Sequence, residues 1–389
     1  GSVDLRNAGY KLAPVDMNLF PGGFNNLADS ALACTIQAAQ DAVERLCPQA
    51  RNVLLIPEQH TRNVFYLSNV QRLVGVLRAA GLNVRVGSWS EQLVQPVTVD
   101  VPGGDGLTIE PLLRSGSRIG LSDFDPDMVL LNNDLSGGIP PLLRGLRGQV
   151  LVPPLAAGWA VRRKSNYFSV YADVAQAFAR LIGIDPWFID PYFTRCSAVD
   201  FHAREGEACL TDSVSALLGR LRAKYQALGI DHTPFVIVKA DAGTYGMGIM
   251  TVRDASEVKH LNRKQRNKMA VGKEGLAVNE VLIQEGVPTL ETVGDGVAEP
   301  VVYMVDRHVV GGFYRVHTQR GREENLNAPG MHFAPLPFAS PCNVPSCSGL
   351  GESPAANRYY TYGVVARLAL LASAIELERT GAAALDGEV

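Results

Sequence analysis

The residues whose types and spacing best suit chemistry lie at 239–248, where glycines follow a lysine at short intervals. They are Lys239, Gly243, Tyr245, Gly246 and Gly248. Apolar runs at 234–238 and 249–252 flank them and predict two strands joined by a turn. Glycines let backbone amides approach phosphate oxygens, and the lysine adds a positive charge. The pattern predicts a phosphate-binding hairpin, although a glycine-rich turn without a ligand has the same pattern.

Two common nucleotide-binding motifs are excluded here. No GxxxxGK[ST] loop occurs, and no helix is expected directly after the glycines, as a Rossmann fingerprint requires. Downstream, the apolar run 281–284 leads into Glu-Gly-Val-Pro, which has the composition of a hinge whose backbone could pair with an adenine edge. We therefore expect Gln284, Glu285 and Val287 to contact a nucleotide.

A second hairpin is predicted at 299–306 and 308–315, and it ends in the cation Arg315. Glu299 begins this hairpin, and Glu323 and Asn325 follow it. Oxygen donors of this kind suit magnesium, or manganese in its place, better than zinc. A solvated acidic turn at 323–325 would have the same composition.

In this order the segments resemble ATP-grasp enzymes, and bacterial glutathione synthetase in particular. Lys239, Gly243 and Gly246 have the spacing of that family's phosphate-covering loop, and Arg315 followed by Asn-Leu-Asn-Ala-Pro-Gly resembles its Arg and Asn-Leu-Ala-Ala-Gly-Gly pair. Two features depart from the family. Val301 stands where the family has an arginine, and the final Glu-Ile-Asn metal motif is missing near the end of the chain. A nucleotide-binding protein without turnover is therefore an alternative.

Over nearly its whole length the chain is similar to the proteobacterial, ATP-grasp-type glutamate–cysteine ligase family. The segments that carry the similarity are 56–63, 131–134, 162–165, 238–248 and 323–330. The resemblance implies that ATP and magnesium drive the ligation of glutamate to cysteine, the first step of glutathione synthesis. A ligase that joins other amino acids, or γ-glutamylcysteine to glycine, would share the ATP-binding residues.

The resemblance also implies roles for single residues. ATP would lie between the hairpin at Lys239 and the hinge, and magnesium would bridge its phosphates to Glu299 and Asn325, with Glu323 as a further ligand. Arg315 would stabilise the charge of the acyl phosphate and of the tetrahedral oxyanion.

The candidates for binding the amino-acid substrates are Glu58, Arg62, Asn63, Asn132, Arg163 and Lys164. The basic side chains, with Arg162 as a further candidate, would hold α-carboxylates, since arginine forks match carboxylates. Glu58 and Asn132 would receive an ammonium group. The basic run at 162–164 could equally be an exposed helix start.

The elements that must position these residues alternate between strands and helices in the first third of the chain. Strands are predicted at 52–56, 83–86, 127–132 and 149–152, and helices at 27–46, 63–80, 163–182, 212–228 and 359–379. Such alternation is typical of a mostly parallel sheet covered by helices. Ligands bind beyond the carboxyl ends of its strands, so 57–63 and 132–134 are expected at one crevice, though ordinary turns look alike.

The length of 389 residues exceeds what one hydrophobic core supports. Pro186 and Pro191 mark a plausible boundary, after which strands joined by glycine-rich loops become more frequent. We therefore expect an α/β protein in which an open, Rossmann-like α/β domain at 1–195 carries the substrate pocket and precedes an ATP-grasp domain at 196–389.

Composition limits the partners and the location. A net charge of -3 provides no positive electrostatic field that would attract nucleic acid. The basic stretch 259–273 lacks interleaved aromatic residues, so we expect it to be a solvated lid or surface. The cysteines lack zinc-ligand spacing, and we expect reduced thiols in the cytoplasm. No uninterrupted run of 18 apolar residues occurs, so no membrane partner is expected, and the apolar helix at 359–379 should be a buried one. Gly1 and Ser2 are expected to remain from a cleaved tag. Homo-oligomerisation is left open.

Overall fold

The computed structural model describes residues 1–20, 22–59, 63–102, 104, 106–243, 248–272, 275, 277–336 and 358–386, and the structural statements below concern these residues. They form a mixed α/β protein built around three main sheets.

The first sheet has the strand order β10-β9-β3-β4-β6-β5 and is parallel except for the β5–β6 pair. Its strands are β3 (Asn52–Pro57), β4 (Asn83–Ser88), β5 (Val97–Val99), β6 (Leu107–Pro111), β9 (Met128–Asn132) and β10 (Val150–Val152). Helices α1 (Leu32–Leu46) and α2 (Val64–Ala79) share a hydrophobic cluster with β3 and β4. The predicted β-α-β pattern is confirmed. The short β5 and β6, and the separate hairpin of β7 (Leu113–Ser115) and β8 (Arg118–Gly120), were not predicted.

The second sheet is antiparallel and has the order β18-β17-β16-β1-β2, with β15 also paired to β16. Its strands are β1 (Ser2–Asn7), β2 (Leu12–Asn18), β15 (Thr292–Val293), β16 (Gly296–Val305), β17 (His308–His317) and β18 (His332–Pro335). The predicted hairpin of β16 and β17 is confirmed. The first two strands were not predicted, and they place the start of the chain in one sheet with residues on the far side of position 195.

The third sheet is antiparallel and has the order β11-β14-β12-β13. Its strands are β11 (Phe193–Ser197), β12 (Val236–Ala240), β13 (Ile249–Val252) and β14 (Glu280–Glu285). The accompanying helices are α4 (Glu207–Leu228), α5 (Ser256–Lys259) and α6 (Arg263–Ala270). A disulfide joins Cys196 of β11 to Cys209 of α4, which corrects the expectation that all cysteines are reduced. These two sulfurs come together because the helix packs on the strand, a contact that their spacing of 13 in the sequence does not reveal.

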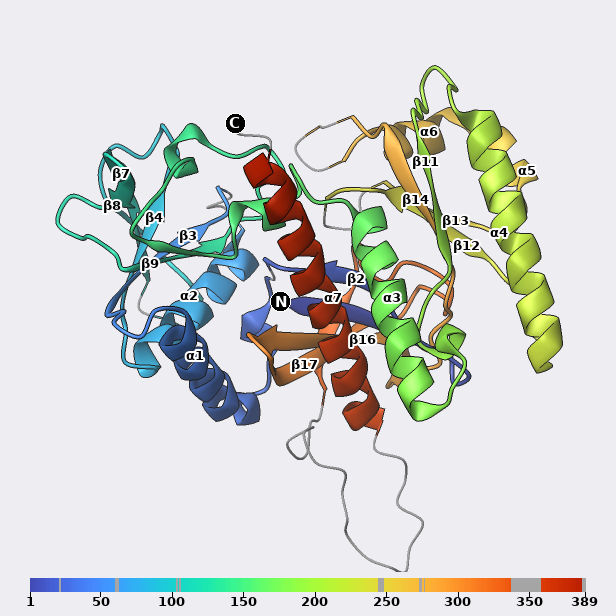
Figure 1. Cartoon of the computed structure of the whole chain (residues 1–389), viewed down its shortest axis with the longest axis horizontal. Helices are drawn as coiled ribbons and strands as arrows, with labels where there is room; N and C mark the ends of the chain where they lie inside the picture. The colour runs from blue at the N-terminus through green and yellow to red at the C-terminus, as the bar shows by residue number, and fades with distance from the viewer. Residues whose placement is uncertain are drawn as a thin grey trace, which may run out of the picture.

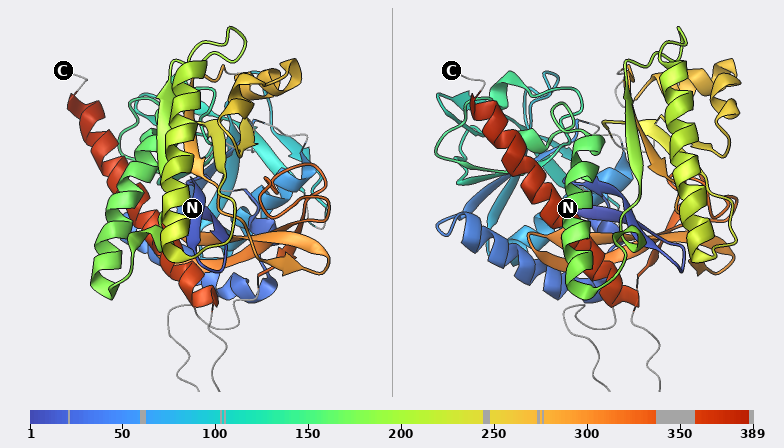
Figure 2. Two further views of the ribbon diagram at one scale, coloured as in Figure 1. Left: turned by 90° about the vertical axis from the view of Figure 1, so that its right-hand side faces the viewer. Right: turned by 45° about the vertical axis from the view of Figure 1, so that its right-hand side comes forward.

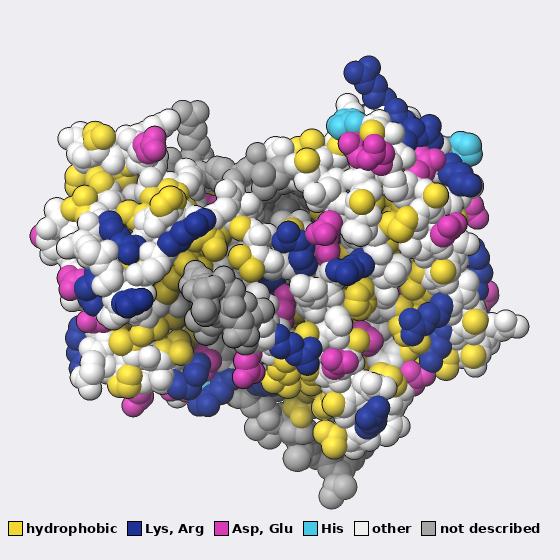
Figure 3. Space-filling view, turned by 45° about the horizontal axis from the view of Figure 1, so that its top comes forward, with side chains coloured by type: hydrophobic (Ala, Val, Ile, Leu, Met, Phe, Trp, Pro, Cys, Tyr) yellow, Lys and Arg dark blue, Asp and Glu magenta, His cyan; other side chains and the backbone are white. Residues whose placement is uncertain are grey.

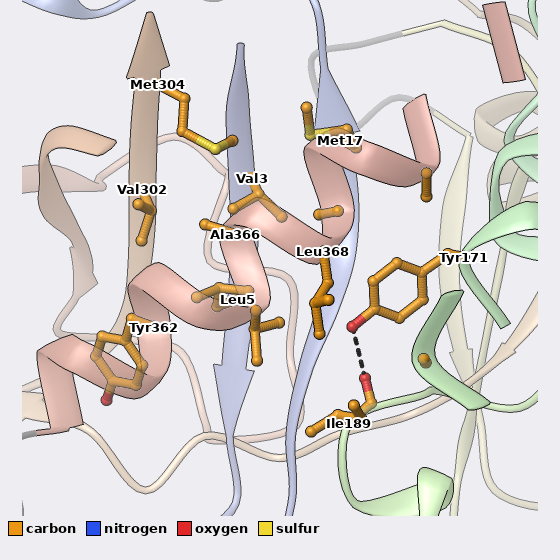
Figure 4. Close-up of a cluster of buried hydrophobic side chains, with 14 of the residues drawn as sticks. Val3, Leu5, Met17, Tyr171, Ile189, Val302, Met304, Tyr362, Ala366 and Leu368 are labelled. Carbon is orange, nitrogen blue, oxygen red and sulfur yellow. Dashed lines mark hydrogen bonds between the residues drawn. The ribbon is translucent and has the colours of Figure 1, made fainter. Parts of the chain in front are cut away.

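Helices α3 (Lys164–Ile182) and α7 (Arg358–Asp386) pack on each other and on the second sheet. Figure 4 shows side chains of α7 against those of β1, β2 and β16, and the hydrogen bond from Tyr171 Oη to Ile189 O at 2.9 Å. By length and composition, Tyr359–Gly381 could cross a membrane. Its buried residues nevertheless include Glu376, which pairs with Arg162 at 2.8 Å in the interior, as a core helix allows.

The three sheets occupy different parts of the molecule. The parallel sheet with α1 and α2 forms one lobe, and the sheet of β11 to β14 with α4 forms another (Figure 1). Helices α3 and α7 and the second sheet lie between them, as the turned views confirm (Figure 2). Acidic and basic side chains are interspersed over the face seen in Figure 3.

Candidate active site

A cavity of about 810 Å3 lies where the three sheets meet. Its walls come from β1, β2, β16 and β17, from the β12–β13 hairpin, from the end of β14, and from the loops after β3 and β9. This volume is typical of a small-molecule site. Segments from both ends of the chain therefore form one cavity.

Most of the predicted site residues line this cavity. Those that do are Glu58, Asn63, Asn132, Lys164, Lys239, Gly243, Gln284, Glu285, Val287, Glu299, Arg315, Glu323 and Asn325. Gly248 and Arg163 are described but are not among the lining residues. Arg62, Tyr245 and Gly246 lie outside the described residues. The crevice expected for 57–63 and 132–134 is thus the same cavity that holds Lys239.

Lys239 is buried near the end of β12. Its Nζ donates to Val15 O at 2.6 Å and to Gln284 Oε1 at 2.9 Å, and it stands 5.2 Å from the centre of the Phe168 ring. Burial lowers the pKa of Lys239 to about 8, and the negative charge of Asp16 opposes this. An anion beside a partly desolvated ammonium stabilises its charged form.

The turn after Lys239 uses glycine where the backbone requires it. Gly243 has φ +96° and Gly248 has φ +60°. Both values lie in the left-handed region that residues with a Cβ rarely adopt. The glycines therefore allow the hairpin to close, and Gly243 also exposes its backbone to the cavity.

The end of β14 is hydrogen-bonded to other parts of the protein. Glu285 N donates to Tyr192 O at 2.7 Å, and Gly286 N donates to Phe235 O at 2.8 Å. Carbonyls of the protein already use these two amides, so the expected pairing of the hinge backbone with an adenine edge stays a prediction for the other backbone groups of the hinge. Gln284 and Glu285 are both among the lining residues of the cavity, and the fully buried Glu285 side chain pairs with Lys11 at 2.9 Å.

Arg315 on β17 is the centre of a network of buried charges. Its Nη1 lies 2.5 Å from Glu299 Oε1 and 2.9 Å from Asp4 Oδ2, and Arg6 Nε lies 2.5 Å from Glu299 Oε2. Burial acts against the charge of Arg315, but the two carboxylates raise its pKa above the ordinary value. Its Nε is buried with no hydrogen-bond partner within the described ranges. Arg315 is thus a permanent cation whose Nε donor is available to a ligand.

The polar residues beyond β3 and β9 hold one another in place. Glu58 Oε1 accepts from Asp134 N at 3.1 Å, and Glu58 N donates to Tyr66 Oη at 2.8 Å. Tyr66 Oη donates to Asn132 O at 2.8 Å and lies 2.9 Å from Asn132 Oδ1. The Asn63 side chain accepts from two amides of the first turn of α2 and so begins that helix. The predicted substrate residues therefore form an ordered polar wall.

The basic run at the start of α3 divides among three environments. Arg162 is buried and pairs with Glu376, and Arg163 is half-exposed and pairs with Glu280 at 3.0 Å. Lys164 is buried at the cavity, where its Nζ lies 2.5 Å from Asp16 Oδ1. Of the three, the structure places only Lys164 at the cavity, so the expectation that Arg163 holds a carboxylate there lacks support from its position.

The family model for glutamate-cysteine ligase matches residues 1–377. The chain belongs to this family. A candidate gamma-glutamylcysteine synthetase from Methylobacillus flagellatus KT has a crystal structure with 60% sequence identity and a TM-score of 0.88, over 97% of this chain and 89% of that chain. The predicted family and enzyme class are confirmed: the protein is an ATP-dependent ligase of glutamate and cysteine, an activity of glutathione biosynthesis.

More distant structures include D-cycloserine synthetase DcsG, with 13% identity and a TM-score of 0.40 over 84% of this chain and 82% of that chain. D-alanyl-alanine synthetase A from Vibrio cholerae has 11% identity and a TM-score of 0.38 over 81% and 79%. Scores this low carry no argument about the ligase. No curated protein is significantly similar to the chain.

The cavity residues of this glutamate–cysteine ligase that were missed in the sequence include Asp4, Arg6, Asp16 and Asn18 on the first two strands. The signal was present, because apolar and polar residues alternate at 3–6 and 15–18, as in strands with one polar face. Asp4 and Asp16 are partners across β1 and β2. Like charges directly opposite destabilise a sheet, so nearby cations are needed. Burial alone would raise the pKa of Asp16, but the positive charges of Lys164 and Lys239 outweigh this effect and lower it.

The residues predicted to bind metal have other partners in the structure of the ligase. Glu299 contacts two arginines, and Glu323 lies 2.5 Å from Arg253 Nη2 and 3.2 Å from His232 Nε2. Asn325 Oδ1 accepts from Asn327 N at 3.0 Å. Across the described part of the chain, no three His, Cys, Asp or Glu side chains gather as a ready-made metal site.

Magnesium nevertheless fits the chemistry of the first two strands of the ligase. Asp4 and Asp16 offer carboxylate oxygens, and Asn18 offers an amide oxygen, all at the cavity. Magnesium prefers such oxygen donors and commonly completes its coordination with waters and substrate phosphates. Asp4 and Asp16 also have cation partners, since Arg315 Nη1 lies 2.9 Å from Asp4 Oδ2 and Lys164 Nζ lies 2.5 Å from Asp16 Oδ1.

Proposed function

We propose that this ligase binds ATP beside Lys239, phosphorylates the γ-carboxylate of glutamate, and transfers the resulting acyl group to the amine of cysteine. The observation that carries the proposal is that one cavity contains Lys239, Arg315 and the polar wall around Asn132. A phosphate-binding cation, an oxyanion-stabilising cation and an amino-acid pocket are what ATP-dependent ligation of a carboxylate requires.

The proposed fold is an ATP-grasp fold preceded by an open, Rossmann-like α/β domain. In it, the third sheet and the second sheet hold the nucleotide between them. The cavity between these sheets supports this proposal. We retain a division near residue 195, with the β1–β2 hairpin assigned to the catalytic unit because β1 pairs with β16.

The nucleotide is proposed to lie between the β12–β13 hairpin and the end of β14. Its phosphates approach Lys239 and Gly243, and its base lies near Gln284, Glu285 and Val287. The proposal is supported by the burial of the Lys239 ammonium, which lowers its pKa, because the negative charge of a phosphate would stabilise the charged form. Asp241 supports the position of the strand end, since its Oδ2 accepts from Ser165 Oγ at 2.6 Å.

The amino-acid substrates are proposed to lie between this nucleotide and the polar wall. Lys164 is the cation best placed for an α-carboxylate, and Glu58 and Asn132 are the acceptors for an ammonium group. Asn63 lies at the same wall. These side chains are already held by hydrogen bonds, which reduces the conformational entropy lost when a substrate binds.

The reaction then follows in two balanced steps. A γ-carboxylate oxygen of glutamate attacks the γ-phosphorus of ATP, and ADP leaves with the bridging oxygen. The amine of cysteine attacks the acyl carbon, the carbon–oxygen bond to phosphate breaks, and a proton is lost from nitrogen. Arg315 stabilises the oxyanion through its available Nε donor. Magnesium, or manganese, neutralises phosphate charge when bound, with Asp4, Asp16 and Asn18 as the proposed ligands.

Asp16 and Asn18 also bear on the metal motif that was expected near the end of the chain. An acidic residue two positions before an asparagine stands in β2, where both side chains face the cavity. We propose that this pair replaces the missing Glu-Ile-Asn motif, and that Glu299, Glu323 and Asn325 support the site through hydrogen bonds and ion pairs. If Asp16 and Asn18 bind the metal, the missing motif no longer favours a nucleotide-binding protein without turnover.

Release of ADP tests the proposed function. The enzyme is supplied with glutamate, cysteine and glycine singly and in pairs, and ADP is expected only with glutamate plus cysteine. ADP formation with γ-glutamylcysteine plus glycine would favour a different ligase, and none with any pair would favour a binding protein. A cytoplasmic location and small molecules as partners are part of the proposal.

A further inference from the structure

Arg6 of β1 is a buried arginine whose three guanidinium nitrogens each have a partner inside the protein. Its Nε lies 2.5 Å from Glu299 Oε2. Its Nη1 donates to Arg322 O at 3.0 Å, and its Nη2 donates to Glu324 O at 2.8 Å. One side chain therefore joins the first strand of the protein to Glu299 and to the segment 322–324, both of which come late in the sequence.

Glu299 lies between two arginines, and each of its carboxylate oxygens has a different one. Oε2 contacts Arg6 Nε, and Oε1 lies 2.5 Å from Arg315 Nη1. Glu299 and Arg315 are direct partners across β16 and β17. On the other side β16 pairs with β1, where Asp4 is opposite Val301, and two residues further along this register Arg6 comes level with Glu299. The sheet therefore places Arg6, Glu299 and Arg315 in one row.

Arg315 pairs with these carboxylates through one nitrogen. Nη1 contacts both Glu299 and Asp4, while Nε is buried and has no partner in the described part of the chain. An arginine and a carboxylate commonly form two parallel hydrogen bonds, because the planar guanidinium matches both oxygens. Here Arg6 holds the second oxygen of Glu299, so the two-bond pair does not form. Arg315 lines the cavity, and its Nε donor is thereby left for a ligand.

Without Arg6, Glu299 would be expected to bind Arg315 more completely. Its Oε2 would lose its donor, and a buried carboxylate oxygen without a donor costs free energy. A rotation of the Glu299 carboxylate would satisfy Oε2 with Arg315 Nε and complete the two-bond pair. The donor proposed for the oxyanion would then be occupied inside the protein, and Glu299 would neutralise the charge of Arg315 more fully.

We propose that Arg6 is a positioning residue for the ligation step, because it holds Glu299 Oε2 away from Arg315 and so keeps a donor of Arg315 free for the oxyanion. The proposal rests on the role that the proposed function gives to Arg315. Arg6 also lines the cavity, but its three nitrogens are already paired within the protein. It therefore acts through Glu299 and supplies no group to the reacting atoms.

Arg6→Met removes the residue that holds Glu299. The single-turnover rate of γ-glutamylcysteine formation at saturating substrates should fall roughly 10- to 100-fold, at most as far as in Arg315→Met. The loss should fall on this rate rather than on KM for ATP, because Lys239 is untouched. Arg6→Lys should lie between Arg6→Met and the parent, since an ammonium can still pair with Glu299 but lacks the planar fork that reaches both carbonyls.

A second substitution separates this role from support of the fold. When Arg6→Met is combined with Glu299→Leu, no carboxylate remains to occupy Arg315 Nε, the net charge equals that of the parent, and Asp4 still holds Arg315 Nη1 at 2.9 Å. The double variant should therefore react roughly tenfold faster than Arg6→Met. If Arg6 only supported the fold, a second buried change would not speed the reaction.

Arg45→Met is the matched control, because it removes an arginine–carboxylate pair at the same hairpin. Arg45 Nη2 lies 2.5 Å from Asp306 Oδ1, and neither residue lines the cavity. This variant should leave the single-turnover rate unchanged. Arg6→Met combined with Arg315→Met should in turn be no slower than Arg315→Met alone, because residues that act as one unit lose their effect together.

Two results would overturn the positioning role of Arg6. One is a double variant with Glu299→Leu that is no faster than Arg6→Met, and the other is a further loss when Arg6→Met is added to Arg315→Met. If Arg6→Met does not fold, the same change is measured in the Glu299→Leu background, where it should no longer slow the reaction; a large further loss there would be equally contrary.

Arg315→Met, measured alongside, distinguishes this inference from the proposed function. An Arg315→Met enzyme that is as fast as the parent would refute the role of Arg315 in the mechanism, and the inference about Arg6 with it. A slow Arg315→Met enzyme beside an Arg6→Met enzyme of parental rate would overturn the inference about Arg6 alone and leave the proposed function intact.

Discussion

Lys239→Met should weaken nucleotide binding while leaving the stability of the ligand-free protein nearly unchanged. Burial lowers the pKa of Lys239 from the ordinary value of 10.5 to about 8. At about 1.4 kcal/mol per pKa unit, the charged side chain costs the folded, ligand-free protein about 3 kcal/mol near neutral pH. Methionine removes this cost, but it leaves Val15 O and Gln284 Oε1 without their donor, at roughly 1–3 kcal/mol each. The effects offset within about 2 kcal/mol.

Binding of ATP should respond much more strongly. A hydrogen bond to a charged group contributes about 1.5–3 kcal/mol, so Kd for ATP should rise roughly 10- to 150-fold. Isothermal titration calorimetry measures this, and chemical denaturation without ligand measures stability. Lys268→Met, at an exposed position on α6, is the control and should change neither quantity. Equal affinity of Lys239→Met and the parent protein for ATP would refute the reasoning.

The same pKa gives two pH effects of opposite sign. Phosphate binding needs the charged ammonium, so affinity for ATP should fall as the pH rises above about 8, and Lys239→Met should lack this decrease. Between about 8 and 10.5 the unfolded chain holds the Lys239 proton more tightly than the folded protein does. The stability of the ligand-free protein should therefore gain from Lys239 across that window as the pH rises. Burial also lowers the pKa of Lys11 to about 8. Lys11 is present in both the parent protein and Lys239→Met, so the difference between their pH profiles reports Lys239 alone.

Three further perturbations have distinct expected results. Arg315→Met should lower kcat by roughly a hundredfold, about 3 kcal/mol of barrier, measured in single-turnover assays, and an unchanged rate would remove it from the mechanism. Asp16→Asn should raise the magnesium concentration needed for half-maximal activity at least about tenfold, by loss of a charged ligand, while Glu323→Gln should not; the reverse order would restore Glu323 as the ligand. Arg162→Met should lower the free energy of unfolding by about 3–5 kcal/mol, because Glu376 is left buried without its partner. In denaturant titrations Arg162→Met combined with Glu376→Leu should recover most of that loss, and no recovery would mean that the ion pair is not the cause.

Local patterns predicted the parts of the fold that local contacts determine. The hairpin at Lys239 and the strands β3 and β9 were recognisable because strand periodicity and turn glycines act within a few residues. The convergence of Glu58 and Asn132 also followed, since neighbouring parallel strands end at the same edge of a sheet. These predictions needed no knowledge of distant pairing.

The contribution of β1 and β2 to the cavity depends on pairing between distant parts of the chain, and the sequence did not predict it. Asp4 lies opposite both Asp16 and Val301, and the second of these partners is almost 300 positions away in the chain. Alternation alone shows that a strand has a polar face but not which sheet it joins. Because alternation does not reveal the partner strand, the sequence also did not show that the second sheet combines β1 and β2, which precede position 195, with strands that follow it.

The basic run at the start of α3 shows a second limit. Helix α3 begins only at Lys164, and Arg163 is its N-cap with an extended backbone, so the three consecutive cations do not share a regular helical face. Arg162 faces the core and Glu376, Arg163 faces Glu280, and Lys164 faces the cavity. Composition could not choose among these directions because the choice depends on how the helix packs.

The central claim is that this cavity activates the γ-carboxylate of glutamate with ATP and joins it to cysteine. Glutamate labelled with 18O in its γ-carboxylate tests it most directly, with the released phosphate analysed by mass spectrometry. The account predicts one 18O atom in each phosphate, formed together with γ-glutamylcysteine and lost in Arg315→Met together with activity. Phosphate without label in the presence of glutamate, cysteine and ATP would contradict the account.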